Sequence, residues 1–219
     1  MSKHAEAHAD LAAANDLRRR AWAKEAPRYD KSIGFFERRV FGTDHRAWAC
    51  SQVTGKTLEV AVGTGLNLSL YPLDVELTGI DLSPEMLAIA RRRAEDSSRS
   101  VDLQVGDAHA LPFEDDTFQT VVCTYSLCNI PDTRLALGEM HRVLRDNGRL
   151  VLVDHVKSDS LPVFWVQKSV ELFSRRLEGE HMTRRPLKQV PAAGFAVVSA
   201  ERRGRAGIVE RVIAIKEAT

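Results

Sequence analysis

The fold of this chain is decided by the stretch Thr57-Leu-Glu-Val-Ala-Val-Gly-Thr-Gly-Leu-Asn67. Residues 58–62 form a short apolar run rich in valine, which is typical of a parallel strand covered on both faces. Gly63 and Gly65 follow, and residues without a Cβ permit a tight turn and the close approach of a ligand. Ligands of open α/β sheets bind beyond the carboxyl ends of the strands. We therefore predict a small-molecule site over these two glycines.

Two acids support this prediction. Glu59 lies inside the apolar run, where a carboxylate is costly unless it is hydrogen-bonded or faces a charged ligand. Asp81 ends the next predicted strand, residues 75–80, and follows Gly63 by 18 positions. An acid at about this spacing can accept hydrogen bonds from the two hydroxyl groups of a ribose. The turn and the second acid together predict a cofactor that contains a nucleoside.

Four motifs follow one another along the chain, namely Glu59-Val-Ala-Val-Gly-Thr-Gly65, Ile80-Asp-Leu-Ser-Pro-Glu-Met-Leu87, Val105-Gly-Asp-Ala-His-Ala-Leu-Pro-Phe113 and His141-Arg-Val-Leu-Arg-Asp-Asn-Gly-Arg-Leu150. In these motifs the chain resembles the class I S-adenosylmethionine-dependent methyltransferases. The resemblance covers residues 29–155 most closely. One departure is Ala61, where the family usually has a glycine. Because its methyl group could crowd the amino-acid end of the cofactor, we expect a small local adjustment there.

The resemblance implies an α/β fold with a Rossmann-like seven-stranded sheet in the order 3-2-1-4-5-7-6, whose last strand is antiparallel. We expect a single domain. Its parts are a helical N-terminal cap (1–50), a cofactor-binding core (56–156), a lid insertion (157–182), and a C-terminal helix and hairpin (183–219). We further expect the first helix to end at Pro27, a short helix at 66–71, a helix at 183–193, and a turn at Asn147-Gly148 before strand five.

The implied cofactor is S-adenosyl-L-methionine. Glu59 would hold its amino-acid end through the ammonium group, Asp81 the ribose, and Asp107 with Ala108 the adenine. The alternative for Asp107 is a cap on a turn. The full predicted cofactor-binding set is Glu59, Gly63, Gly65, Asn67, Asp81, Leu82, Met86, Asp107, Ala108 and Thr124.

The acceptor is expected to lie beside the ends of strands four and five. Tyr125 and Asn129 follow strand four, and each either faces the acceptor or packs within the loop. His155 ends strand five and can act as a base near neutral pH, although a histidine there can also be structural. Tyr29 follows an arginine, a pattern that often lies against cofactor and substrate in related methyltransferases. The predicted catalytic residue is His155, and the predicted substrate residues are Tyr29, Tyr125, Asn129 and His155.

Composition restricts the partners. The 219 residues are 44% hydrophobic and 28% charged, which is typical of a globular domain. The net charge of +1 predicts no nucleic-acid partner, and we interpret the isolated basic run at 91–93 as a solvated helix face. The sequence shows neither a transmembrane segment nor a secretory signal. Cys50, Cys123 and Cys128 are odd in number and lack metal-ligand spacing, so we expect free thiols, no metal and a cytoplasmic location.

Residues 158–178 carry more apolar side chains than a surface helix needs, with Val166, Val170, Phe173 and Leu177 in one stripe. Three interpretations stay open: core packing, a lid over an apolar acceptor, and a peripheral membrane contact, since Trp, Phe and basic residues suit a headgroup boundary. The aromatic stripe of the helix after Pro27 similarly predicts either core packing or a cap over the site.

Within the family the chain looks nearest to the ubiquinone/menaquinone-biosynthesis methyltransferases and the soluble phosphatidylethanolamine N-methyltransferases. Asp154-His155-Val156 and the stretch 181–195 also resemble thiol S-methyltransferases. Our leading hypothesis is methyl transfer to a small, fairly apolar acceptor. The alternatives are a phospholipid headgroup N-methyltransferase, a thiol S-methyltransferase and a non-catalytic cofactor-binding protein. The glycine turn lacks the later glycine of the dinucleotide fingerprint, which disfavours a dehydrogenase. The acceptor, the atom methylated and the oligomeric state stay open.

Overall fold

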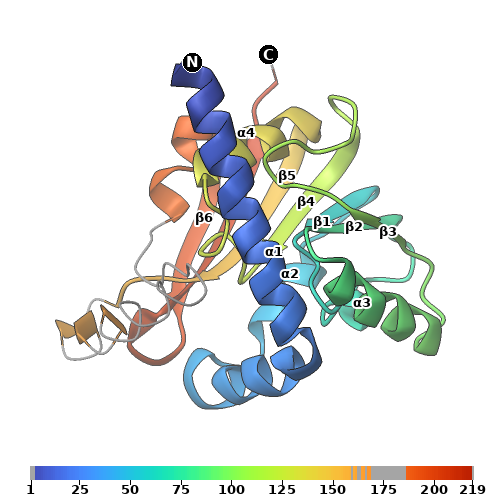
Figure 1. The fold of residues 1–219 in the computed structure, drawn as a ribbon, viewed down its shortest axis with the longest axis vertical. Helices are drawn as coiled ribbons and strands as arrows, with labels where there is room; N and C mark the ends of the chain where they lie inside the picture. The colour runs from blue at the N-terminus through green and yellow to red at the C-terminus, as the bar shows by residue number, and fades with distance from the viewer. Residues whose placement is uncertain (1–2, 159, 162–163, 166, 169–185, 219) are drawn as a thin grey trace.

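The computed structural model describes residues 3–158, 160–161, 164–165, 167–168 and 186–218. Its sheet has seven strands in the order β3-β2-β1-β4-β5-β7-β6, as expected (Figure 1). The strands from β1 to β5 pair in parallel, and β7 is antiparallel to both β5 and β6. Their bounds are β1 Thr57–Val60, β2 Leu77–Asp81, β3 Asp102–Val105, β4 Phe118–Thr124, β5 Leu144–His155, β6 Phe195–Arg203 and β7 Val209–Lys216. The predicted fold class is confirmed.

Helices flank this sheet. The longer ones are α1 (Lys3–Phe36), α2 (His45–Ser51), α3 (Pro84–Asp96) and α4 (Thr133–Val143), and the π-helical turn η1 (Glu37–Phe41) follows α1. The sequence encodes two of the helix starts locally. The Ser83 hydroxyl accepts from the Met86 backbone N–H, and Asp132 accepts from the N–H groups of Arg134 and Leu135. Both side chains satisfy donors that a helix N-terminus leaves without intrahelical partners.

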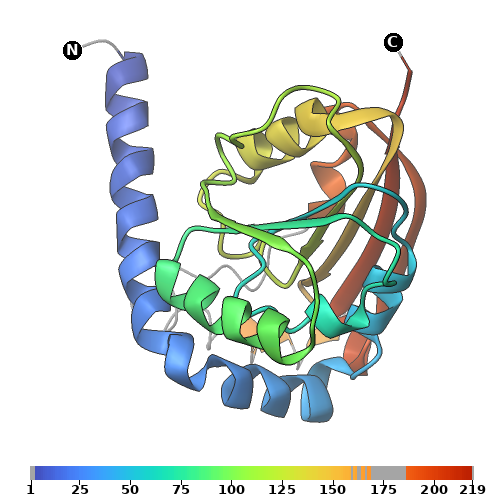
Figure 2. The same ribbon diagram turned by 90° about the vertical axis from the view of Figure 1, so that its right-hand side faces the viewer.

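The first helix corrects one prediction. Pro27 lies inside α1, which continues to Phe36 instead of ending before the proline. Figure 2 shows that the N-terminal half of α1 stands along one side of the molecule and that the chain then turns beneath α3. A proline removes one helical hydrogen bond and permits such a bend without ending the helix, because packing on both sides of the bend supplies the lost stability.

Two further predicted helices are short turns. The segment predicted as a helix at 66–71 contains only η2 (Leu68–Leu70), because Gly65 and Pro72 leave too little chain for an α-helix. The segment predicted at 183–193 contains η3 (Pro186–Lys188) and η4 (Pro191–Ala193), and its first residues lie outside the described part. η5 (Arg205–Gly207) connects β6 to β7. The predicted turn at Asn147 lies within β5, with φ of 59° and a register shift against β4.

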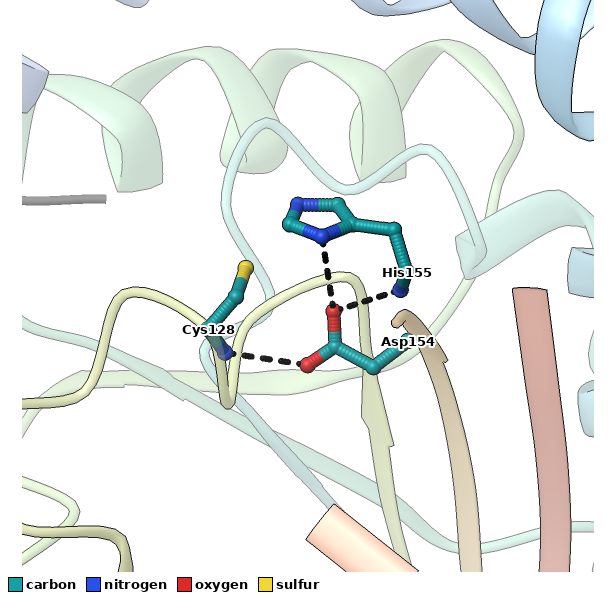
Figure 3. A group of neighbouring side chains, drawn as sticks. All are labelled: Cys128, Asp154 and His155. Atoms are coloured by element: carbon teal, nitrogen blue, oxygen red, sulfur yellow. Dashed lines mark hydrogen bonds and ion pairs between the residues drawn. The ribbon is translucent and has the colours of Figure 1, made fainter. Parts of the chain in front are cut away.

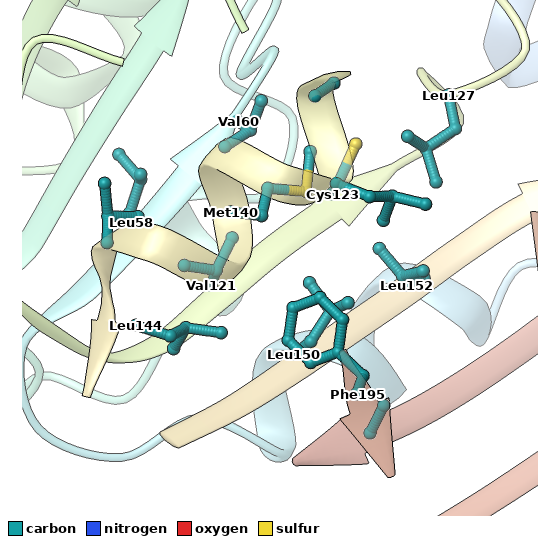
Figure 4. Packing of buried hydrophobic residues seen from close by; sticks show 14 of the residues in the cluster. Leu58, Val60, Val121, Cys123, Leu127, Met140, Leu144, Leu150, Leu152 and Phe195 are labelled. Atoms are coloured by element: carbon teal, nitrogen blue, oxygen red, sulfur yellow. The ribbon is translucent and has the colours of Figure 1, made fainter. Parts of the chain in front are cut away.

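The core occupies both faces of the central strands. Alternate residues of β4 and β5 enter two hydrophobic clusters, with Val121 and Leu150 in one and Val122 and Val151 in the other. This alternation follows from the two-residue period of a strand. Figure 4 shows the first cluster, in which Met140 of α4 covers the strands. In β1, Leu58 and Val60 belong to the first cluster, whereas the Glu59 side chain contacts Tyr71 of the second cluster.

The apolar stripe predicted at 158–178 and the proposed lid fall mostly outside the described residues. Within the described part of the chain, no helix is long and apolar enough to cross a membrane.

Candidate cofactor and acceptor site

The glycine turn is tied to the end of β2 by Asp81. Its Oδ2 accepts from the Gly63 backbone N–H at 2.9 Å, and its Oδ1 accepts from the Ser83 N–H at 2.8 Å. Burial raises the pKa of Asp81 to about 6, although these backbone bonds oppose the rise. Each carboxylate oxygen has two lone pairs, so both oxygens retain the capacity to accept from a ligand hydroxyl.

The backbone of the turn requires residues that tolerate positive φ. Gly63 has φ of 58° and Gly65 has φ of 77°. A Cβ on Gly65 would lie 2.7 Å from Leu68 Cδ1, whereas a Cβ on Gly63 would meet no described heavy atom within 4 Å. Gly65 is therefore needed for packing inside the turn, and Gly63 borders open space where a ligand fits.

Ala61 also adopts positive φ, at 57°. This conformation costs a residue with a Cβ about 1–2 kcal/mol, which explains why a glycine suits the position. Ala61 lines the site cavities. The local adjustment that we expected there around a bound cofactor stays a prediction.

A cavity lies between α1 and the carboxyl ends of the strands. Many predicted residues line it, namely Gly63, Asp81, Leu82, Met86, Asp107, Ala108, Tyr29, Tyr125 and Asn129. The structure thus brings together the end of β2 and residues that follow β1, β3 and β4 with the aromatic residue of the N-terminal cap. A smaller cavity beside the turn adds Thr124 and shares Gly63 and Tyr29 with the larger one. Burial raises the pKa of Tyr29 to about 12, a shift that the nearby Arg46 charge opposes.

Glu59, Asn67 and Gly65 do not line either cavity. Glu59 is buried, and its two oxygens accept from Asn67 Nδ2 at 2.7 Å and from the Tyr71 hydroxyl at 2.9 Å. Asn67 Nδ2 also donates to Thr124 Oγ1 at 3.0 Å. Burial raises the pKa of Glu59 to about 7. Asn67 and Tyr71 therefore supply the hydrogen bonds that a buried Glu59 needs. A direct contact between Glu59 and the cofactor stays a prediction.

Asp107 lies at the other end of the larger cavity. Its Oδ1 accepts from the His109 backbone N–H at 2.9 Å and lies 2.6 Å from His109 Nδ1. Its Oδ2 accepts from Asn15 Nδ2 of α1 at 2.6 Å. Burial alone would raise the pKa of Asp107, but hydrogen bonds from His109 and Asn15 lower that pKa below its usual value. Asp107 both stabilises its own loop and faces the cavity, so the two readings of this residue are compatible.

Helix α1 is held over the site by further contacts. Thr64 of the turn donates to Asp30 at 2.6 Å, and Arg93 of α3 donates to the same carboxylate at 2.5 Å. Arg18 Nε donates to the backbone carbonyl of Asn129. The cavity residues that sequence reasoning missed include Asn15, Arg18 and Trp22. No motif marks them, because their roles depend on where α1 packs.

The predicted acceptor side has an aromatic wall. Phe41 stacks on Tyr125 with ring centroids 5.6 Å apart and on His155 with centroids 5.9 Å apart. Tyr125 has φ of 53°, and its buried hydroxyl has no hydrogen-bond partner in the described part of the chain. His155 packs against Phe41 and lines neither of these two cavities. Its role as a base stays a prediction.

Figure 3 shows the neighbours of His155. Asp154 accepts from the backbone N–H groups of Cys128 at 3.0 Å and of His155 at 2.8 Å. One metal-ligating atom from each of Cys128, Asp154 and His155 lies within 4.8 Å of the others, a proximity that the sequence spacing did not predict. Burial raises the pKa of Asp154. The carboxylate therefore connects the loop after β4 to the end of β5. None of the three cysteines, all of which are described, forms a disulfide.

Comparison with known proteins adds sequence and fold relatives. A family model described as "Methyltransferase domain" matches residues 58–152. The chain is 42% identical over 125 residues to a phosphatidylethanolamine N-methyltransferase of Cereibacter sphaeroides, which covers 56% of this chain and 62% of that protein. It is 34% identical over 154 residues to the ubiquinone/menaquinone biosynthesis C-methyltransferase UbiE of Citrifermentans bemidjiense. That match covers 64% of this chain and 63% of the relative. The chain thus matches less than two thirds of the length of these relatives.

Solved structures share the fold at low sequence identity. A SAM-dependent methyltransferase of Thermotoga maritima, described as a possible histamine N-methyltransferase, aligns with a TM-score of 0.71 and 20% identity over 90% of this chain and 99% of that one. The [4+2]-cyclase SpnF aligns with a TM-score of 0.66 and 22% identity over 80% of each chain. These likenesses concern the fold alone. Residues 58–152 therefore match a family model of methyltransferase domains, and the chain shares its fold with the solved Thermotoga maritima methyltransferase.

Proposed function

We propose that this protein transfers a methyl group from S-adenosyl-L-methionine to a small, fairly apolar acceptor. The observation that carries the proposal is the pair formed by Asp81 and the glycine turn. Asp81 is bonded to the Gly63 N–H at 2.9 Å, and Gly63 borders open space in a cavity that continues to Asp107. A nucleoside cofactor fits this arrangement, because carboxylates at both ends of the cavity can accept from its hydroxyl and amino groups.

The cofactor would supply a reactive methyl group on a positively charged sulfur. The chain's own residues would then orient the reactants and exclude water. Asp81 would hold the ribose, and Asp107 with Ala108 the adenine. Tyr125 and Phe41 would form the apolar wall against the acceptor. For a hydroxyl or carbon acceptor we propose His155 as the base, whereas a thiol acceptor is partly ionised near neutral pH and needs less help.

The second candidate is N-methylation of a phospholipid headgroup. It is favoured by the 42% identity to a phosphatidylethanolamine N-methyltransferase. The start of the segment after β5 also suits a lipid surface. Leu161 and Trp165 are 71% and 61% exposed, and Lys157 Nζ lies 4.1 Å from the Phe164 ring centroid. Amphipathic side chains of this kind can lie at a headgroup boundary. We include a peripheral membrane contact and a cytoplasmic location in this proposal.

The experiment is a methyl-transfer assay with isotopically labelled S-adenosylmethionine and four acceptor classes. These are phosphatidylethanolamine vesicles, a demethylated naphthoquinol, a small alkyl thiol and a phenol, with products identified by mass spectrometry. We expect turnover on one apolar acceptor, and a lower rate with Asp81→Ala when S-adenosylmethionine is below saturation. A rise in activity only on phosphatidylethanolamine vesicles would establish the second candidate. Tight binding of S-adenosylhomocysteine with no turnover on any class would instead support a non-catalytic binding protein.

A further inference from the structure

Arg46 belongs to none of the four sequence motifs, yet it lines the smaller cavity beside the glycine turn. Its side chain is 11% exposed. Nε donates to Glu37 Oε1 at 2.6 Å, and Nη1 donates to Asn67 Oδ1 at 3.1 Å and to Thr124 Oγ1 at 3.3 Å. These three neighbours thus fix the guanidinium of this α2 residue between η1, the residue before η2 and the end of β4.

The remaining nitrogen of this side chain is different. Arg46 Nη2 is buried and has no hydrogen-bond partner in the described part of the chain. The guanidinium group is always protonated in proteins, so Nη2 carries two N–H donors. A buried donor without an acceptor costs about 1–3 kcal/mol, and more when the group is charged. Nη2 of this cavity-lining residue therefore has the capacity to donate to an acceptor that arrives with a ligand.

The two cavities differ in the chemistry that they offer. The larger cavity presents the carboxylates of Asp81 and Asp107, which accept hydrogen bonds, and its lining cation Arg18 donates to the Asn129 carbonyl. The smaller cavity shares Tyr29, Ala61 and Gly63 with it, and Arg46 is the one charged residue among its described lining residues. A ligand that spans both would carry donors at one end and an anionic group at the other. An adenosyl amino acid has this polarity, since its α-carboxylate lies at the end opposite to the nucleoside.

We propose that Arg46 binds the α-carboxylate of the cofactor through Nη2, an assignment that rests on the proposed function. A charged guanidinium–carboxylate hydrogen bond is about twice as strong as a neutral one. The contact would also connect the cofactor to Glu37 and so to η1, which follows α1. Arg46 thereby becomes the residue that distinguishes a cofactor with an intact amino-acid end from a bare nucleoside.

The test compares two ligands that differ in this end. S-adenosylhomocysteine has the α-carboxylate, whereas methylthioadenosine keeps the nucleoside and sulfur but lacks the amino-acid end. Calorimetric titration of Arg46→Gln should show a loss of about 10- to 100-fold in affinity for S-adenosylhomocysteine, the factor expected for a charged hydrogen bond. Its affinity for methylthioadenosine should stay within about 2-fold of that of the wild type. The matched control is Arg38→Gln, which changes an exposed arginine of η1 and should affect neither ligand.

Equal losses for both ligands, or no loss for either, would overturn the assignment. If Arg46→Gln does not fold, the wild-type protein provides the second test, because the decarboxylated analogue of S-adenosylhomocysteine should bind about 10- to 100-fold more weakly than the parent compound. Equal affinities would overturn the assignment. Failure of wild-type protein to bind S-adenosylhomocysteine at all would contradict the proposed function itself, so the two failures are distinguishable.

Discussion

The side-chain amide of Asn15 donates a 2.6 Å hydrogen bond to Asp107 Oδ2, although the two residues lie 92 positions apart in the chain. Asp107 is the acid to which the family resemblance assigns the adenine. The bond therefore fastens α1 across the adenine end of the proposed site, and Asp30 fastens the same helix to the glycine turn through Thr64 at 2.6 Å. These two contacts hold α1 beside the larger cavity, which Asn15 of this helix lines.

Loss of the Asn15 contact should speed ligand entry. Removing one hydrogen bond weakens the closed position of α1 by about 1 kcal/mol, so Asn15→Ala should raise the association rate of S-adenosylhomocysteine by about 5-fold. Stopped-flow fluorescence can follow this, because Trp22 lines the cavity. Asp10→Ala, an exposed change on the same helix, is the control. Association rates that are equal in Asn15→Ala and the wild type would show that α1 does not limit entry.

The affinity for S-adenosylhomocysteine should depend on pH through Asp81. Ribose hydroxyls donate to the ionised carboxylate, and the pKa of Asp81 in the unliganded protein is raised to about 6. Affinity should therefore rise about 10-fold between about pH 5 and pH 7, as the ionised fraction grows. Asp81→Asn should remove this dependence, and Asp81→Ala should weaken binding by about 1–3 kcal/mol. Titration calorimetry at several pH values measures both effects, and a pH dependence that persists in Asp81→Asn would assign it to another group.

The stability of the protein should fall as Glu59 ionises. Its pKa is raised from 4.5 to about 7 by burial, so between these values the folded state holds a proton that the unfolded state has lost. Stability thus decreases with rising pH across this window, by on the order of 3 kcal/mol for this group. Glu59→Gln should flatten that part of the pH profile in urea unfolding, while the exposed change Glu95→Gln should not. An unchanged slope in Glu59→Gln would contradict the shifted pKa.

Turnover should require His155, whereas binding of S-adenosylhomocysteine should not. His155 is only 5% exposed, stacks on Phe41 and does not line the larger cavity. With a hydroxyl or carbon acceptor, His155→Ala should lower kcat by about 100-fold or more, the usual contribution of a general base. S-adenosylhomocysteine affinity should be retained. His141→Ala, which changes a half-buried histidine on α4, is the control. Unchanged turnover in His155→Ala would exclude His155 as the base.

Two glycine substitutions should have opposite effects on stability. Gly65→Ala forces a Cβ to within 2.7 Å of Leu68 Cδ1 at φ of 77°, so it should destabilise the protein by about 1–3 kcal/mol. Gly138→Ala places a Cβ in open space on the exposed face of α4 and should stabilise the protein by about 0.5–1 kcal/mol. Denaturant unfolding compares them. Similar stability in the wild type and both variants would mean that neither strain in the turn nor helix propensity at Gly138 affects the free energy of unfolding.

Much of the architecture was predictable from local sequence. The valine-rich run, the glycine turn and Asp81 predicted the site at the carboxyl edge of the sheet, and the resemblance predicted the strand order. The caps at Ser83 and Asp132 were predictable because a capping side chain bonds backbone groups two or three residues away. The course of α1 past Pro27 was not, because packing against distant elements outweighed a local helix-breaking preference.

The sequence by itself determined the sheet, the glycine turn and the acid at the end of β2, since strand period, backbone freedom and residue spacing act over a few neighbouring positions. Only the tertiary structure decided that Asn15 reaches Asp107, that Arg46 faces the smaller cavity with one donor unsatisfied, and that Cys128 lies beside Asp154. These contacts join segments far apart in the chain. Their formation depends on how whole elements pack, and that information is spread over the core instead of residing in any one motif.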